Sequence, residues 1–243
     1  MSDADLHFYF DPVCPFAWLT STWVRQVMAA RDYRVEWRLV SLRLMNAHID
    51  YDTHFPPDYE AGHNAGLRML RVAARARSEH GAEALDPLQA AIGRAVFDQG
   101  SWADDGVPLA ERERELATTR TILTEAGLPL ELAEALYDED WDGVIKDETD
   151  TGLALTGRDV GTPIIHVDPP DGPAFFGPVI SRRPTDEEAA ELWDHVVALA
   201  RFPGFSEFKR SLRERPQLRA FGVEAGEVGL VEDWHGGSRR LKR

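Results

Sequence analysis

The residue in this sequence with the clearest potential for chemistry is Cys14, the only cysteine among 243 residues. The apolar run Leu6 to Phe10 predicts a buried strand, and the pattern from Pro15 to about Ala30 predicts an amphipathic helix. Cys14 therefore stands at a helix N-terminus, where unpaired N–H groups and the helix dipole favour an anion. We expect this position to lower the pKa of the thiol below its ordinary value of about 8.5 and so to favour the reactive thiolate.

A free cysteine is often a small buried hydrophobe rather than a nucleophile, and Cys14 alone does not decide between the two. The order strand, Cys-Pro-x-x and helix is typical of thioredoxin-like redox proteins, and here the four residues are Cys14-Pro15-Phe16-Ala17. Ala17 stands where such proteins carry a second cysteine, so no internal disulfide can form. Redox chemistry at Cys14 must then pass through a mixed disulfide with another molecule.

The composition limits the class of protein. Hydrophobic residues make up 43% and charged residues 28% of the chain, as in a soluble globular protein. The sequence has no apolar run of about 18 residues and no basic region ahead of an apolar one at its start, so we expect neither a transmembrane helix nor a secretory signal. A single cysteine suits the cytoplasm. The net charge of −15 argues against nucleic acid as a partner, and abundant Ala and Arg with few Lys suggests a bacterial genome of high GC content.

The first half of the chain reads as an α/β unit followed by helices. Arg34 to Val40 alternates apolar and polar residues, which predicts a second strand and completes a βαβ unit. Ser41 to Tyr59 reads as a loop, with or without short turns, after the carboxyl end of that strand, where open α/β sheets bind ligands. From Glu60 to about Ile145 the periodicity is helical without a strand, which indicates a separate helical subdomain.

The second half returns to α/β structure. A helix is expected from about Trp141 to Thr156. Pro163 then leads a strand at Ile164 to Val167, and a proline at this place can have a cis peptide bond. Ala174 to Phe176 predicts a short strand that pairs with it as an antiparallel hairpin. Thr185 or Asp186 caps the closing helix.

These elements predict an α/β protein with a thioredoxin fold and a large inserted all-helical subdomain. The expected thioredoxin-like domain is discontinuous, residues 1–59 and 142–202, and the helical insertion covers residues 60–141. Residues 203–243 form a C-terminal extension, of which we expect the last twenty or so residues to be poorly ordered. No pair of histidines has convincing metal spacing and there is no second cysteine, so we expect no metal site.

In this order the motifs resemble the DsbA-like thioredoxin family, and more narrowly its cytoplasmic branch that includes mycothiol-dependent nitroreductases. The resemblance runs from Tyr9 to about Arg210. The stretches that carry it are Phe10 to Pro15, Ser41 to Asn46, Leu85 to Leu88, Val160 to Val167, Phe175 to Val179 and Phe205 to Arg210.

The resemblance implies roles for particular residues. Cys14 matches the nucleophilic cysteine, and Thr162 with Pro163 matches the cis-proline loop that faces it and pairs with an extended substrate. Asn46 and Tyr59 match positions that line the active-site cleft.

The residues that follow the cysteine are expected to complete the site. Phe16 stands where that branch carries Trp. Together with Phe10 and Trp18 it is expected to form an apolar rim for a bound thiol, while Pro15 and Ala17 complete the active-site loop.

The sequence thus predicts a cytoplasmic thiol oxidoreductase that acts through Cys14 alone and holds no bound cofactor. A low-molecular-weight thiol, mycothiol or glutathione, is the expected co-substrate, and a disulfide or an electrophilic small molecule the expected substrate. The family implies a homodimer.

Two alternatives stay open. One is a thiol transferase resembling kappa-class glutathione transferases and hydroxychromene-carboxylate isomerases, which share this architecture and activate a thiol with a serine at the helix start. The other is a redox-inactive binding protein of thioredoxin fold in which Cys14 is incidental.

Overall fold

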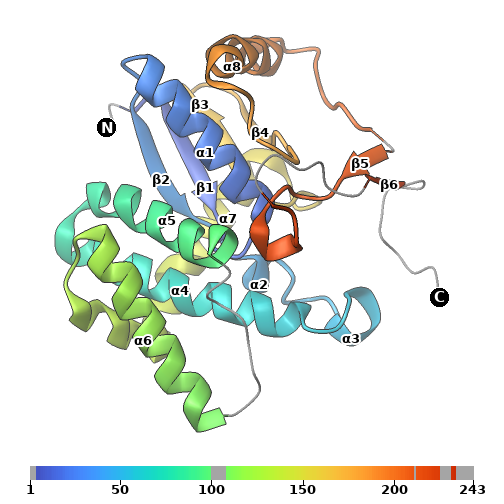
Figure 1. Ribbon diagram of the computed structural model, residues 1–243. Coiled ribbons are helices and arrows are strands. Elements are labelled where there is room, and N and C mark those ends of the chain that lie inside the picture. The colour runs from blue at the N-terminus through green and yellow to red at the C-terminus, as the bar shows by residue number, and fades with distance from the viewer. Residues whose placement is uncertain (1–3, 100–107, 211, 225–230, 234–243) are drawn as a thin grey trace.

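The centre of the molecule is a four-stranded mixed sheet with strand order β2-β1-β3-β4. The computed structural model describes residues 4–99, 108–210, 212–224 and 231–233 (Figure 1). Strand β1 (Leu6–Phe10) pairs in parallel with β2 (Val35–Leu39) and antiparallel with β3 (Ile164–Val167). Strand β4 (Ala174–Phe176) pairs antiparallel with β3, as the predicted hairpin required. This mixed sheet, with helices inserted between β2 and β3, confirms the predicted fold class.

Alternation along β1 separates the two faces of the sheet. Phe8 and Phe10 belong to the main core with α1 (Pro15–Ala30) and α8 (Asp186–Arg201), whereas Tyr9 packs with α7 (Asp142–Thr156) on the other face. Helices α1 and α8 meet through Trp23 and Trp193, whose rings lie 5.5 Å apart at 86°. Thr185 caps α8 in a capping box with Glu188, which confirms the predicted start of the closing helix.

The described residues between β2 and α7 form helices joined by short connections and contain no strand, and in Figure 1 the longer of these helices lie together beside the sheet. The stretch predicted as a loop carries two short helices, α2 (Leu42–Met45) and α3 (Tyr51–His54). The later elements are α4 (Tyr59–His80), η1 (Ala82–Ala84), α5 (Leu85–Gly93), the π-helical turn η2 (Arg94–Asp98), α6 (Pro108–Ala126), η3 (Leu130–Tyr137) and η4 (Glu139–Trp141). The boundaries of the predicted subdomain stay a prediction.

The C-terminal extension contains β5 (Leu212–Glu214), η5 (Arg219–Phe221) and β6 (Val231–Asp233), and β5 pairs antiparallel with β6. We expect the last twenty or so residues to be poorly ordered. Apart from β6, these residues lie almost entirely outside the described ranges, so this stays a prediction. Phe205 and Phe208 have helical spacing in the sequence, yet residues 202–210 contain no helix.

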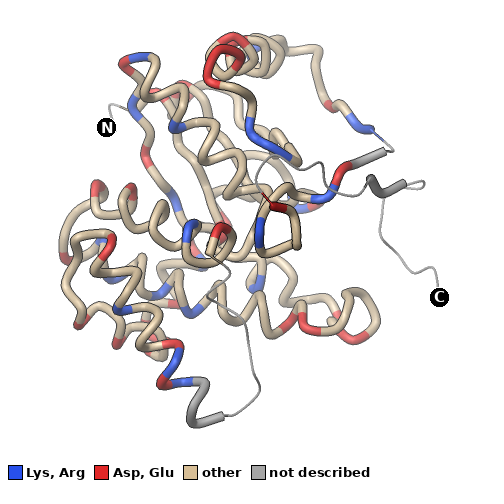
Figure 2. The backbone as a smooth tube through the Cα atoms, in the orientation of Figure 1, with Lys and Arg blue, Asp and Glu red and all other residues tan. Residues whose placement is uncertain are grey.

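Charged residues of both signs are interspersed along the helices that pack on the sheet and along those inserted between β2 and α7 (Figure 2). In the part of the chain that the structure describes, no helix is both long and apolar enough to cross a membrane. The same residues include no group of three or more His, Cys, Asp or Glu side chains placed to hold a metal ion.

Candidate active site

Cys14 is the N-cap residue of α1, with extended backbone, and Pro15 is the first residue of the helix. The N–H of Ala17 donates to Cys14 Sγ over 3.4 Å, and the thiol donates to the Thr162 carbonyl oxygen over 3.4 Å. The peptide bond between Thr162 and Pro163 is cis. The structure therefore brings the predicted active-site loop and the predicted cis-proline loop together around one sulfur atom.

Burial dominates the electrostatics of this thiol. Only 6% of Cys14 is exposed, and the loss of hydration raises the pKa of the thiol to about 11. The N–H of Ala17 stabilises the thiolate but does not offset the burial, and the charge of Asp11 adds to the rise. The expectation that the helix start lowers this pKa is therefore wrong for this conformation, because the N-cap interaction is weaker than desolvation.

Asp11 is a functional candidate that the sequence analysis did not identify. Its buried carboxylate accepts the N–H of Val13 over 2.9 Å and the N–H of Leu42 over 2.7 Å. A Cβ at Gly66 of α4 would lie 2.7 Å from Asp11 Oδ1, so the helix approaches the carboxylate closely only because this residue is glycine. The carboxylate thus joins the active-site loop, the start of α2 and α4.

Burial also sets the charge of this group. Loss of hydration raises the pKa of Asp11 to about 7, and the two N–H groups lower it by less than burial raises it. Asp11 therefore titrates near neutral pH. The sequence carried one signal, an acid three residues before the cysteine in an apolar stretch, but not its burial.

A cavity of about 10 Å³ lies beside the thiol. This is about the space that one water molecule needs, so this cavity itself holds no more than a water. The residues that line it are Phe10, Asp11, Pro12, Cys14, Trp18, Gln89, Ile92, Gly93 and Phe97.

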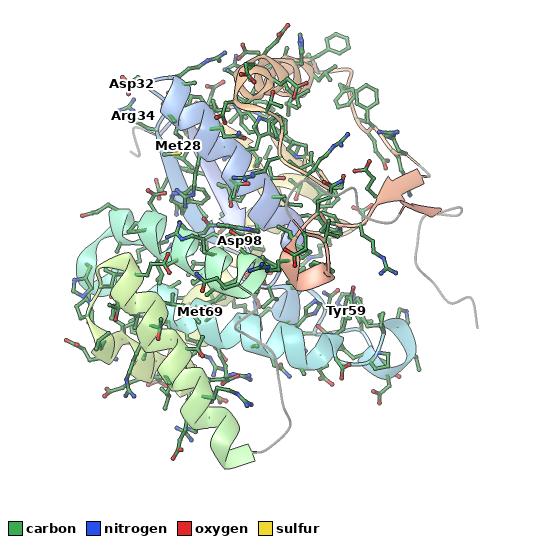
Figure 3. All side chains as sticks on the ribbon, in the orientation of Figure 1. Met28, Asp32, Arg34, Tyr59, Met69 and Asp98 are labelled. Atoms are coloured by element: carbon green, nitrogen blue, oxygen red, sulfur yellow. The ribbon has the colours of Figure 1, made fainter. Side chains whose placement is uncertain are left out.

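Of the three residues expected to form an apolar rim, Trp18 and Phe10 lie inside the molecule. Trp18 is only 5% exposed, and its indole N–H donates to Asp98 Oδ1 over 3.1 Å. Figure 3 shows Asp98 at the junction between α1 and the helical part. Phe10 is fully inside the core, and Phe16 is half-buried against it. Trp18 lies inside because η2 covers this end of α1, where Phe97 shares a small core with it.

Asn46 and Tyr59 lie on the α2–α4 side of the molecule. The side-chain amide of Asn46 donates to the Leu42 carbonyl over 2.8 Å at the end of α2. Tyr59 begins α4, is 38% exposed and stacks on Phe55 with ring centres 5.6 Å apart (Figure 3). Neither residue is among those that line the cavity beside Cys14, and their role in thiol binding stays a prediction.

A buried polar pair close to Tyr59 was also not identified from the sequence. The Tyr51 hydroxyl lies 2.8 Å from His63 Nδ1 and joins α3 to α4. Burial lowers the pKa of His63 to about 4, and the positive charge of Arg43 acts in the same direction. His63 is therefore neutral at physiological pH and serves to hold these two helices together.

Comparison with solved structures and with known protein sequences gives several similar proteins. The disulfide oxidoreductase DsbA from Proteus mirabilis has 16% sequence identity and a TM-score of 0.45, over 82% of this chain and 90% of that protein. The cytosolic disulfide reductase DsbM from Pseudomonas aeruginosa has 18% identity and a TM-score of 0.47, over 80% of this chain and 99% of that protein. These likenesses are too loose to bear on activity.

A sequence relative covers most of the chain. The uncharacterised protein Rv2286c of Mycobacterium tuberculosis is 29% identical over 205 residues, which are 84% of this chain and 80% of that protein. Residues 13–210 match the model of the Rv2466c-like family, described as mycothiol-dependent nitroreductase Rv2466c. The match spans Cys14, the helical segment and the Thr162–Pro163 loop, and the chain therefore belongs to the Rv2466c-like family.

Proposed function

We propose that this chain is a monothiol oxidoreductase of the cytoplasm in which Cys14 exchanges disulfides with a low-molecular-weight thiol, mycothiol in the first place. The observation that carries the proposal is the position of the sole thiol, which caps α1 and contacts the carbonyl that precedes the cis-proline. Membership of a family described as mycothiol-dependent supports the choice of thiol.

The chemistry needs only one protein sulfur. The Cys14 thiolate attacks one sulfur of a disulfide, forms a mixed disulfide with that half and releases the other half as a thiolate that takes up a proton. A second small-molecule thiolate then attacks the mixed disulfide on the substrate-derived sulfur. This step releases a mixed small disulfide and restores the Cys14 thiolate. One half of the substrate is thus reduced for each small thiol consumed, and a second small thiol completes the reduction by exchange with the mixed small disulfide.

Ala17 contributes a backbone donor in place of a resolving thiol. Its N–H lies 3.4 Å from Cys14 Sγ and points at the atom on which charge develops when the mixed disulfide is cleaved. Thiolate formation nevertheless requires hydration of the sulfur or movement of the cavity walls, because burial raises the pKa of Cys14.

The matched pair Cys14→Ser and Thr22→Ser tests this proposal. Thr22 lies on the same helix and its hydroxyl donates to the Leu19 carbonyl, a bond that serine preserves. With a small disulfide as substrate and mycothiol or glutathione as reductant, we expect the Thr22 variant to turn over like the wild type and the Cys14 variant to show only the uncatalysed rate. Full activity of the Cys14→Ser protein contradicts the proposal.

One observation favours a second candidate function. The buried thiol with its raised pKa fits a redox-inactive thioredoxin-fold protein whose cysteine is a packing residue. In that case Cys14→Ala leaves ligand binding nearly unchanged and costs only the stability that the packing of the buried sulfur supplies, and neither disulfide forms an adduct with the folded wild-type protein.

A further inference from the structure

A segment beyond the family match folds back onto the wall of the active site. The match ends at residue 210, and residues 214–223, which we term the C-terminal strap, follow it. Leu218 of the strap is 6% exposed and forms a small core of its own with Trp18, Leu19 and Phe97. In Figure 1 the part of the strap that contains η5 lies beside the start of α1 and the end of α5.

Hydrogen bonds fix the strap to the thioredoxin-like part. The N–H of Gln217 donates to the Ser181 carbonyl over 2.7 Å, and the Ser181 hydroxyl donates to Glu214 Oε2 over 2.9 Å. Ser181 lies between β4 and α8. The strap therefore bridges this connection and η2, which carries Phe97.

The strap reaches the thiol through two side chains. Trp18 and Phe97 share the small core with Leu218 and also line the cavity beside Cys14. Trp18 has no room to retreat toward α5, because a Cβ at Gly93 would lie 2.0 Å from its ring. Its indole N–H is bonded to Asp98. Leu218 thus packs behind a wall that α5 and η2 hold from the other side.

We propose that Leu218 is a specificity-determining residue, which keeps Trp18 and Phe97 against the thiol and so restricts Cys14 to small-molecule disulfides rather than disulfides in folded proteins. The inference rests on the proposed role of Cys14 as nucleophile. Its physical basis is the cavity of about 10 Å³, which leaves room for no more than a water on the Trp18 side of the thiol. Burial of Leu218 in the same small core as Trp18 and Phe97 opposes widening of this cavity.

The test compares reagents of different size on the reduced full-length chain. Cys14 is the only thiol, so alkylation by iodoacetamide and by a bulky fluorescein maleimide can be followed by intact mass. Leu218→Ala removes the contact with the wall. The matched control is Phe221→Ala, because Phe221 belongs to the same strap but is 43% exposed and outside the small core.

We expect Leu218→Ala to raise the rate of Cys14 alkylation by the bulky maleimide about tenfold, equivalent to about 1.4 kcal/mol of lost packing. The rate with iodoacetamide should rise much less. The Phe221 variant should react like the wild type with both reagents. Equal acceleration of both reagents would show unfolding rather than widening and would overturn the proposal, as would unchanged rates.

Two further measurements keep the result interpretable. Leu218→Met conserves volume and should retain wild-type rates with both reagents, while the ratio of the two rates in denaturant gives the value for a fully accessible thiol. Alkylation reports access and not turnover. If Leu218→Ala favours the bulky reagent but the wild type reduces no disulfide, the proposed function alone is refuted. If the wild type reduces small disulfides but Leu218→Ala does not change the ratio of the two alkylation rates, the role of Leu218 alone is refuted.

Discussion

Replacement of Asp11 by Asn tests how a buried acid beside the thiol affects stability and reactivity. Asparagine has nearly the same shape and is neutral at every pH. Its carbonyl oxygen can accept one of the two N–H groups, from Val13 or Leu42, that the carboxylate accepts now. The other N–H then faces an NH₂ group, and leaving it unsatisfied costs roughly 1–3 kcal/mol at all pH values.

The pH-dependent part follows from the raised pKa. The Asp11 pKa rises from 3.8 to about 7 on folding, which is about three units and on the order of 4 kcal/mol. Because the folded state holds the proton more tightly than the unfolded state, this stability is present at pH values below 3.8 and is lost as the pH rises to about 7. The Asp11→Asn protein has no such loss.

Urea denaturation of both proteins between about pH 4 and pH 8 measures the difference, and Asp32→Asn, an exposed acid, controls for the removal of one negative charge. We expect Asp11→Asn to lower the free energy of unfolding most at low pH. Toward pH 8 the free energy of unfolding of the variant, relative to that of the wild type, should rise by several kcal/mol, close to the full value of about 4. A difference between the two proteins that does not change with pH would refute the reasoning. The substitution should also accelerate alkylation of Cys14 at fixed pH, because it removes a charge that raises the pKa of the thiol.

Two other substitutions test the packing around the site. Gly93→Ala places a Cβ 2.0 Å from the Trp18 ring, so we expect a loss of roughly 1–3 kcal/mol in chemical denaturation; Gly62→Ala in α4, where nothing lies within 4 Å, should stabilise instead by roughly 0.5–1 kcal/mol. Equal effects at the two glycines would contradict the close contact. His63 has a pKa lowered from 6.5 to about 4, so the wild type should lose stability as the pH falls through that interval. His63→Gln should remove this loss in the same assay, and an unchanged loss of stability at acid pH would show that burial does not hold the His63 imidazole neutral.

Local patterns were sufficient to predict most of the framework. The strand from Leu6 to Phe10 and the helix from Pro15 to Ala30 agree with the structure at both ends, because apolar periodicity and the proline at the first helical position mark them clearly. The short helices α2 and α3 have only four residues each. Their stability comes from caps such as Ser41 and Asp50 and from packing on α4, which periodicity does not report.

The electrostatics of the site depended on contacts between distant segments. The helix start at Cys14 favours a thiolate, but its burial by Trp18, α5 and the Thr162 loop is a tertiary property and reverses the net effect. Asp11 is likewise ordinary in sequence. Its near-neutral pKa follows from burial, to which the close approach of Gly66, 55 residues away along the chain, contributes. The N–H of Leu42, 31 residues away, lowers the pKa by less than burial raises it. Leu218 is more than 200 residues from Cys14 and lies outside the family match, so no motif pointed to it.

The measurement that tests the central claim most directly is the intact mass of reduced protein after incubation with oxidised mycothiol and, separately, with oxidised glutathione over a range of pH. The account predicts one adduct per chain, formed faster as the pH rises because burial raises the pKa of Cys14, reversed by the free thiol and absent from the Cys14→Ser variant. No adduct with either disulfide at any pH at which the protein remains folded would contradict it.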